Sequence, residues 1–283
     1  MKTCYLLGYP VEHSLSAEMQ NAAFRALDLD YRYELLSVRP ERLEVTVEKL
    51  RDASVRGANV TIPHKVPVME SLDALSEEVA AIGSVNTIIN EGGQLIGHNT
   101  DGGAAIRALE EAHGPLRGAS VVVIGAGGAA RALGYHISRV VDELTIMNRK
   151  LDRAEALAVH LRNLPGCEAT ITASKLTRDD VESDLEHANI LVNATPVGMT
   201  PHADESPIDG GLLRPGLTVF DLVYNPLRTR LLSDAESAGA KTLSGLRMLA
   251  YQGAAAFELW TGVDAPEELM IEVLEKRLGG GSR

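Results

Sequence analysis

The chain has 283 residues, a formal net charge of −12 and a hydrophobic fraction of 45%. An acidic protein repels phosphate backbones and anionic lipids, so this charge argues against nucleic acid or a membrane as a partner. Two cysteines are too few for a disulfide scaffold, and no stretch approaches the ~18 consecutive apolar residues of a membrane span. We therefore expect a cytoplasmic protein of about two domains.

In the N-terminal third, short β-branched runs alternate with amphipathic stretches, which is typical of βα units on a parallel sheet. The predicted strands are Cys4–Leu7, Tyr31–Leu36 and Ala58–Val60, and the predicted helices are Ala17–Leu27 and Leu43–Asp52. A glycine-containing turn at 91–94 separates Val85–Ile89 from Leu95–Gly97. This arrangement predicts a hairpin.

A second series of strands and helices begins after Gly118. The predicted strands are Val121–Ile124, Leu144–Met147, Ala169–Thr172, Ile190–Asn193 and Thr218–Asp221. Helices are predicted between them, including Asp152–Leu164, and apolar residues at i, i+3 and i+4 predict two more at Leu246–Trp260 and Pro266–Leu278. The glycine-rich tail, residues 279–283, should fray.

The two series meet at a predicted helix that starts at Asp101. We therefore expect an α/β protein with two α/β domains around a cleft. The first comprises residues 1–101 and is completed by C-terminal helices within 246–283. The second, residues 102–245, should be a doubly wound Rossmann-type dinucleotide-binding sheet.

A glycine-rich motif supports the dinucleotide site. The strand Val121–Ile124 runs into Gly-Ala-Gly-Gly-Ala-Ala, a G-x-G-x-x-A pattern between a strand and a helix. Gly125 permits the tight turn, Gly127 lets the backbone approach a pyrophosphate, and Ala130 lets the helix pack close to the strand. The N–H groups of the helix would then face the anion. The predicted contacts from this loop are Gly125, Ala126, Gly127, Gly128 and Ala129.

The end of the next strand indicates which nucleotide binds. NAD sites usually carry Asp or Glu ~20 residues after the first glycine, to hold the ribose 2′-hydroxyl. Here Asn148 follows Gly125 by 23 residues, and Arg149, Lys150 and Arg153 gather beside it. These cations suit a 2′-phosphate and oppose the dipole of the helix that they begin, so stability alone does not favour them. We therefore predict NADP(H) as the cofactor.

A polar segment follows a strand end in the first domain. Asn59–Lys65 reads Asn-Val-Thr-Ile-Pro-His-Lys. It places hydroxyl, amide and amine groups at the edge of the sheet where ligands bind in open α/β proteins. Alone, Lys65 is more simply a solvated surface lysine.

The segment Asn59–Lys65 does not stand alone, and together with six other motifs it resembles the shikimate dehydrogenase family. The motifs, in family order, are Ser14–Ser16, Asn59–Lys65, Gly83–Thr87, Gly97–Asp101, Asn193–Met199, Asp221–Pro226 and Gly245–Gln252. The likeness extends from Ser14 to about Gly262. It implies reversible NADPH-dependent reduction of 3-dehydroshikimate to shikimate, in the route to chorismate and the aromatic amino acids. We expect a monomer or homodimer.

The resemblance also implies roles for individual residues. Lys65 and Asp101 match the catalytic pair, in which an ammonium stabilises charge on the carbonyl oxygen and supplies a proton. Asp also suits a helix N-cap, and both roles can hold. The implied substrate-binding residues are Ser14, Ser16, Thr61, Asn86, Tyr224 and Gln252, and the further implied cofactor contacts are Thr195, Leu222 and Gly245.

Two residues depart from the family pattern. Lys150 stands where Thr or Ser is common, which replaces a neutral hydroxyl contact with charge. Ser84 stands where Ala is common and should change packing slightly. No metal is expected, because the histidines lack metal-ligand spacing.

Two other functions stay open. A quinate/shikimate dehydrogenase using NAD is the nearest, since Ser14, Ser16 and Thr61 do not exclude the extra hydroxyl of quinate. The other is a non-catalytic ligand sensor, because a fold alone never fixes function. The presence of Lys65 and Asp101 argues against the sensor.

Overall fold

The computed structural model describes residues 1–279 and divides into two units. Unit 1 comprises Met1–Asp101 and the chain from Leu249 onward, and unit 2 comprises Gly102–Met248. Helix α10 (Glu267–Gly279) ends at the first residue of the tail that the sequence predicted to fray. The rest of that tail, residues 280–283, lies outside the described residues.

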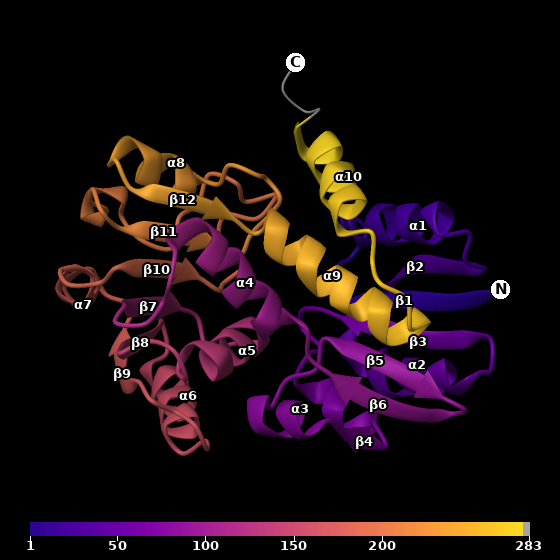
Figure 1. The fold of residues 1–283 in the computed structure, drawn as a ribbon. Helices are drawn as coiled ribbons and strands as arrows, with labels where there is room; N and C mark the ends of the chain where they lie inside the picture. The colour runs from indigo at the N-terminus through magenta and orange to yellow at the C-terminus, as the bar shows by residue number, and fades with distance from the viewer. Residues whose placement is uncertain (280–283) are drawn as a thin grey trace. The chain divides into compact units, whose positions relative to one another are not determined.

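Unit 1 contains a six-stranded sheet in the order β2-β1-β3-β5-β6-β4 (Figure 1). Its strands are β1 (Lys2–Gly8), β2 (Tyr31–Ser37), β3 (Val55–Val60), β4 (Ala74–Leu75), β5 (Thr87–Glu91) and β6 (Gln94–His98). β1, β2 and β3 are parallel, as the βα alternation predicts, but β5 is antiparallel to β3 and β6. The sheet is mixed because the predicted hairpin joins it. Gly92 and Gly93 both have positive φ, as its two-residue turn requires.

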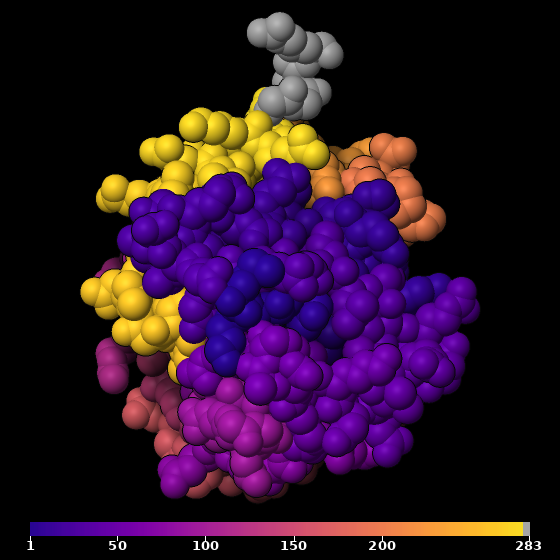
Figure 2. All heavy atoms as spheres, turned by 90° about the vertical axis from the view of Figure 1, so that its right-hand side faces the viewer, coloured from indigo at the N-terminus to yellow at the C-terminus, as the bar shows by residue number. Residues whose placement is uncertain are grey.

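The helices of unit 1 come from both ends of the chain. They are α1 (Ser16–Ala26), α2 (Leu43–Glu48), α3 (Glu77–Ile82), α10 and most of α9 (Leu246–Thr261). The predicted helix Leu43–Asp52 is shorter than expected, because its last turn, Lys49–Arg51, is 3₁₀. α10 packs against α1, where Arg277 forms an ion pair with Glu18 at 3.2 Å. In Figure 2 the yellow C-terminal segment adjoins the indigo N-terminal segment.

Trp260 of α9 fixes that helix against the unit 1 sheet. Its side chain is 1% exposed, and its Nε1 donates a hydrogen bond to the carbonyl oxygen of Ile88 at 3.0 Å. Gly57 of β3 makes this contact possible. A Cβ at that position would lie 2.1 Å from the Ile88 oxygen and 2.5 Å from Trp260 Nε1. Only glycine fits where the helix and the strand come this close.

Replacing Gly57 with alanine should therefore destabilise the fold by about 2–3 kcal/mol, because backbone and indole must shift to admit the methyl group. Gly103 of α4 is the matched control, since a Cβ there meets nothing within 4 Å. Gly103→Ala should stabilise the helix by about 0.5–1 kcal/mol. Urea denaturation of both variants measures the effects. Equal shifts of the same sign would contradict this account of Gly57.

Unit 2 is a parallel six-stranded sheet in the order β12-β11-β10-β7-β8-β9. Its strands are β7 (Ser120–Ile124), β8 (Glu143–Asn148), β9 (Thr170–Lys175), β10 (Ile190–Asn193), β11 (Thr218–Asp221) and β12 (Lys241–Ser244). Its helices are α4 (Asp101–His113, from Gly102), α5 (Gly128–Ile137), α6 (Leu151–Arg162), α7 (Arg178–Leu185) and α8 (Arg230–Ser237). The strand order reverses at β7, as in a doubly wound Rossmann sheet.

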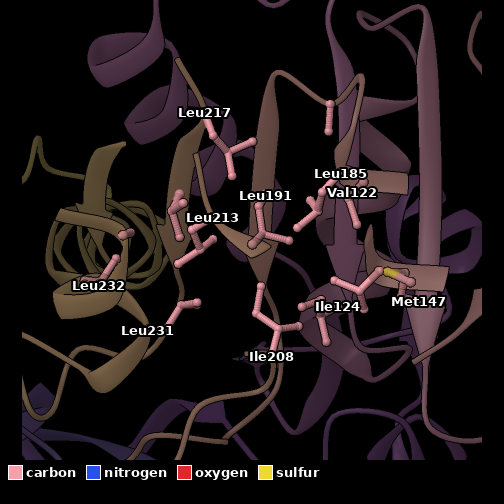
Figure 3. Close-up of a cluster of buried hydrophobic side chains, with 14 residues drawn as sticks. Val122, Ile124, Met147, Leu185, Leu191, Ile208, Leu213, Leu217, Leu231 and Leu232 are labelled. Atoms are coloured by element: carbon pink, nitrogen blue, oxygen red, sulfur yellow. The ribbon is translucent and has the colours of Figure 1, made fainter. Parts of the chain in front are cut away.

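Apolar residues on the strands of unit 2 meet its helices in a buried core. Figure 3 shows this cluster, to which β7, β10 and β11 contribute Val122, Ile124, Leu191 and Val219, and α8 contributes Leu231. Such a core fixes the strand ends, and with them the loops that carry the predicted cofactor contacts. Within the described residues, every helix is too short or too polar to cross a membrane.

Candidate active site

Lys65 and Asp101 form an ion pair in unit 1. Lys65 lies in the turn after β3, and its Nζ donates to Asp101 Oδ2 at 2.5 Å. The two side chains are 15% and 5% exposed. Asp101 is the first residue of α4, and its own N–H donates to the Asn99 side chain at 3.0 Å. The fold thus joins an amine and a carboxylate that are 36 residues apart in sequence.

Asn86 fixes the other oxygen of this carboxylate. Its Nδ2 donates to Asp101 Oδ1 and to Thr100 Oγ1, both at 2.9 Å, and lies 3.4 Å from Gln252 Oε1. The Thr100 hydroxyl in turn donates to the Gln252 carbonyl at 3.0 Å. Three sequence-predicted residues are therefore brought together with Lys65. Thr100 was missed, although its hydroxyl beside Asp101 was a signal for it.

A buried chain of hydrogen bonds orients Asn86. The Tyr33 hydroxyl donates to Asn59 Oδ1 at 2.8 Å, and Asn59 Nδ2 donates to Thr87 Oγ1 at 3.0 Å. Thr87 Oγ1 then donates to Asn86 Oδ1 at 3.0 Å, and this oxygen also accepts the Thr100 N–H at 2.8 Å. Because Asn86 Oδ1 is fully used as an acceptor, its amide nitrogen must face Asp101.

The other predicted substrate-binding residues lie in loops or, in the case of Ser16, at the start of a helix. Ser14 Oγ donates to Ser16 Oγ at 3.2 Å, and Ser16 begins α1. Thr61 follows β3, and its methyl group occupies the space that a side chain at Gly8 would need. Tyr224 belongs to unit 2, in the loop after β11.

His64 precedes Lys65 and is buried. Its Nε2 lies 2.6 Å from the carbonyl oxygen of Val38. The imidazole therefore ties the turn that carries Lys65 to the segment after β2.

In unit 2 the glycine-rich loop has the geometry that its sequence predicts. Gly125 has φ +118°, and a Cβ on it would lie 3.0 Å from the Ala194 carbonyl oxygen. Gly127 precedes α5, and a Cβ on it would meet nothing within 4 Å. Ala130 is fully buried. The loop is thus closely packed on the sheet side at Gly125 and open at Gly127. Gly128 and Ala129 begin α5, directly after Ala126 and Gly127.

The predicted basic cluster lies at the end of β8. Asn148 is the last residue of that strand, and its Nδ2 donates to the Lys150 carbonyl at 2.9 Å, which shapes the turn into α6. Arg149, Lys150 and Arg153 are all exposed. Within residues 1–279 none of these three side chains forms an ion pair or a hydrogen bond. Their charges therefore remain available to an anion.

The loops after β10 and β11 are linked by a buried carboxylate. Asn193 and Asp221 end adjacent strands and face each other in register. Asp221 Oδ1 accepts from Asn193 Nδ2 at 2.9 Å, and Asn193 Oδ1 accepts from the N–H and the hydroxyl of Thr195 at 3.1 and 2.7 Å. A Cβ on Gly245 would lie only 2.2 Å from the Leu222 carbonyl oxygen. The three residues Thr195, Leu222 and Gly245 thus lie in this packed group of loops.

The chain matches three family models along its length. Residues 6–88 match the shikimate dehydrogenase substrate binding domain, 107–202 match shikimate / quinate 5-dehydrogenase, and 245–275 match the shikimate 5′-dehydrogenase C-terminal domain. A shikimate dehydrogenase (NADP(+)) of Methanopyrus kandleri is 50% identical over 276 residues, covering 96% of this chain and 94% of that protein. The chain belongs to the shikimate dehydrogenase family. It is therefore an oxidoreductase.

Solved structures of this family share the fold. The shikimate 5-dehydrogenase of Thermus thermophilus, solved with NADP(H) and shikimate, has a TM-score of 0.87 and 37% identity, covering 98% of this chain and 99% of that one. The quinate dehydrogenase of Corynebacterium glutamicum, solved with NAD, has a TM-score of 0.86 and 31% identity, covering 96% and 98%. The fold therefore occurs in enzymes solved with either cofactor.

Unit 2 fits the dinucleotide of this family of dehydrogenases. The open backbone at Gly127 leaves room for a pyrophosphate, and the first turn of α5 points N–H groups toward it. Arg149 and its two basic neighbours are exposed cations of the kind that would suit a 2′-phosphate. In residues 1–279, no group of three or more His, Cys, Asp or Glu side chains is placed to hold a metal ion.

Burial raises the pKa of Asp221 from 3.8 to about 6. Its folded form therefore retains a proton that the unfolded chain releases between these pH values, so the free energy of unfolding falls as the pH rises from about 4 to about 6. The difference amounts to about 3 kcal/mol at neutral pH. Asp221→Asn should remove this component. In urea denaturation, the free energy of unfolding of the variant should rise relative to that of the wild type as the pH increases from about 4 to about 7. If the difference between the two free energies does not depend on pH, this assignment is refuted.

Proposed function

We propose that the chain catalyses the reversible, NADPH-dependent reduction of 3-dehydroshikimate to shikimate, with Lys65 and Asp101 as the catalytic pair. The observation that carries this proposal is the contact between Lys65 Nζ and Asp101 Oδ2. The pair lies in a unit whose residues 6–88 match the family's substrate-binding model. This reaction belongs to the route to chorismate and the aromatic amino acids.

Lys65 is suited to the proton chemistry of this reaction. When bound at unit 2, NADPH supplies a hydride to the carbonyl carbon. The electron pair of the C=O bond moves onto oxygen, where the Lys65 ammonium stabilises the negative charge and donates a proton. Lys65 then regains a proton from water. In the reverse direction the neutral amine accepts the hydroxyl proton.

Asp101 has a positioning role as well as a binding role. Because Asn86 holds one of its oxygens and Lys65 the other, the carboxylate has a single orientation. It fixes the ammonium, and it can accept a hydrogen bond from a ring hydroxyl of the substrate. The amide and hydroxyl groups of Asn86, Thr61 and Gln252 suit a polyol, since each desolvated O–H needs a partner.

In this proposal, the hydroxyls of the serine pair bind the carboxylate of the substrate. Ser14 and Ser16 carry hydroxyls at the start of α1, where the helix dipole favours an anion. Tyr224, in the loop after β11, is a further residue that the family resemblance assigns to the substrate.

For the cofactor, we assign the pyrophosphate to Gly125–Ala129 and the 2′-phosphate to Asn148, Arg149, Lys150 and Arg153. Thr195, Leu222 and Gly245 lie near the carboxyl ends of β10, β11 and β12 and would contact the other half of the dinucleotide.

A second candidate is quinate dehydrogenase activity with NAD. The Corynebacterium glutamicum relative supports it, because an enzyme named for quinate has the same fold at 31% identity. Steady-state kcat/KM values for shikimate and quinate, each with NADP and NAD, separate the two candidates. We expect shikimate with NADP to exceed every other combination by at least about tenfold, since the basic cluster favours the extra phosphate. A highest value for quinate with NAD would favour the second candidate.

A further inference from the structure

Asp221 is a fully buried carboxylate to which the proposed reaction assigns no role. Its exposed fraction is 0%, and it ends β11. Three hydrogen bonds satisfy it: Oδ1 accepts from Asn193 Nδ2 at 2.9 Å and from the Val223 N–H at 3.0 Å, and Oδ2 accepts from the Thr229 hydroxyl at 2.6 Å. All three donors are uncharged, and within residues 1–279 Asp221 forms no ion pair.

Hydrogen bonding alone does not require this negative charge. An asparagine at position 221 has the same shape, and its Oδ1 can accept from Asn193 and Val223. Its amide nitrogen can donate to Thr229 Oγ1 once that hydroxyl turns, and this oxygen can still accept the Leu232 N–H, which it holds at 3.2 Å. Burying a carboxylate without a cation is unfavourable. The fold therefore carries a charge that its own contacts do not need.

The position of Asp221 in the sheet indicates what the charge faces. β7 carries the glycine-rich loop, β8 and the basic cluster lie on one side of it, and β10 and β11 lie on the other. A dinucleotide crosses the carboxyl edge of such a sheet, with its pyrophosphate at the glycine loop. If the 2′-phosphate binds the basic cluster after β8, the nicotinamide half would lie on the side of β10 and β11.

The nicotinamide ring carries a positive charge when oxidised and none when reduced. We propose that the fixed negative charge of Asp221 makes unit 2 favour the oxidised cofactor. With a neutral residue at this position, the affinity for the oxidised cofactor relative to the reduced one would be lower. This inference rests on the proposed function, which requires the cofactor to bind unit 2. Asp221 acts through space and holds the loops after β10 and β11, and it does not touch the substrate.

The same charge has a consequence for the reaction. As the carbonyl of the substrate is reduced, positive charge appears at this edge of the sheet, and Asp221 stabilises it. Interactions that strengthen as charge develops accelerate the step, whereas uniform binding does not. Asp221 also shifts the equilibrium between bound substrates and bound products toward the oxidised cofactor.

Equilibrium binding tests this inference without turnover. Titration calorimetry gives Kd for NADP+ and for NADPH on the wild type and on Asp221→Asn. The variant should bind NADP+ about three- to tenfold more weakly, the size expected for one unit charge in partly screened protein, while its Kd for NADPH changes less than about twofold. Thr229→Val is the matched control. It removes the bonds of the Thr229 hydroxyl to Asp221 and to the Leu232 N–H but keeps the charge, so it should leave the ratio of the two Kd values unchanged.

The outcomes are distinguishable. If Asp221→Asn weakens the binding of both cofactors by the same factor, Asp221 only holds the loops. If the substitution changes neither Kd, its charge does not act on the cofactor. Either result overturns the inference. A variant that does not fold would also overturn it, because asparagine can pair with Asn193, Val223 and Thr229, with Thr229 as acceptor instead of donor. A changed ratio of the two Kd values in Thr229→Val, which keeps the charge, would show that loop contacts set the ratio and would overturn the inference as well. Failure of wild-type protein to bind either cofactor would instead reject the proposed function.

Discussion

Lys65→Ala should lower kcat for shikimate oxidation by about 10³-fold and leave KM for shikimate nearly unchanged. A positioned proton donor and acceptor contributes about 10²–10⁴-fold, and loss of the charge at the carbonyl oxygen adds to the effect. The substrate is held mainly by hydroxyl and amide groups, so its affinity depends little on this amine. Steady-state kinetics with saturating NADP measures both constants.

Lys49→Ala is the matched control for this substitution. Lys49 is also in unit 1, is exposed, and lies in the 3₁₀ turn after α2. Its loss should leave kcat unchanged. The thermal midpoint of Lys65→Ala must also be followed, because removing one partner of a buried ion pair destabilises a protein. If Lys65→Ala keeps kcat within about threefold of wild type, the catalytic assignment is wrong.

Arg149→Ala should weaken NADP+ binding by about 10- to 100-fold and leave NAD binding almost unchanged. A charged hydrogen bond to a phosphate contributes about 1.5–3 kcal/mol, and only NADP+ carries the 2′-phosphate. Since the Arg149 side chain has no partner within the described residues, its removal should not disturb the fold. Calorimetric titration with each nucleotide measures the two Kd values.

Arg117→Ala is the control for charge alone. Arg117 is 83% exposed and precedes β7, at the opposite end of the sheet from the glycine-rich loop. Its loss removes one positive charge from unit 2, as Arg149→Ala does, and should leave the Kd values of NAD and NADP+ unchanged. Weakening of NAD and NADP+ by the same factor in Arg149→Ala would mean that this side chain does not recognise the 2′-phosphate.

The parts of the fold that local patterns determine were predictable from the sequence. Val121–Ile124 is a continuous apolar run before glycines, and β7 ends where it was expected. β12 was missed because Lys241–Ser244 is a short edge strand with two polar ends. The hairpin was expected to start at Val85, but β5 starts at Thr87. The Val85 N–H instead donates to the carbonyl oxygen of Lys65, which does not belong to a strand of the sheet.

The site was less predictable than the fold. Spacing along the chain gives no reason for Lys65 to meet Asp101, and the resemblance to the shikimate dehydrogenase family was needed to pair them. Thr100 and Asn59 act through hydrogen bonds to Asn86, which depend on how distant strands and a helix pack. Asp221 looked like an ordinary strand end. Its burial is a tertiary property that no local pattern contains.

A double-mutant cycle on Lys65 and Asp101 tests the central claim most directly. The kcat values of Lys65→Ala, Asp101→Asn and the double variant are compared with wild type. If the ammonium and the carboxylate act as one unit, the double variant should lose no more activity than the worse single variant, as residues that act together are not additive. If the two losses multiply in the double variant, Lys65 and Asp101 act independently, and the proposed pair is contradicted.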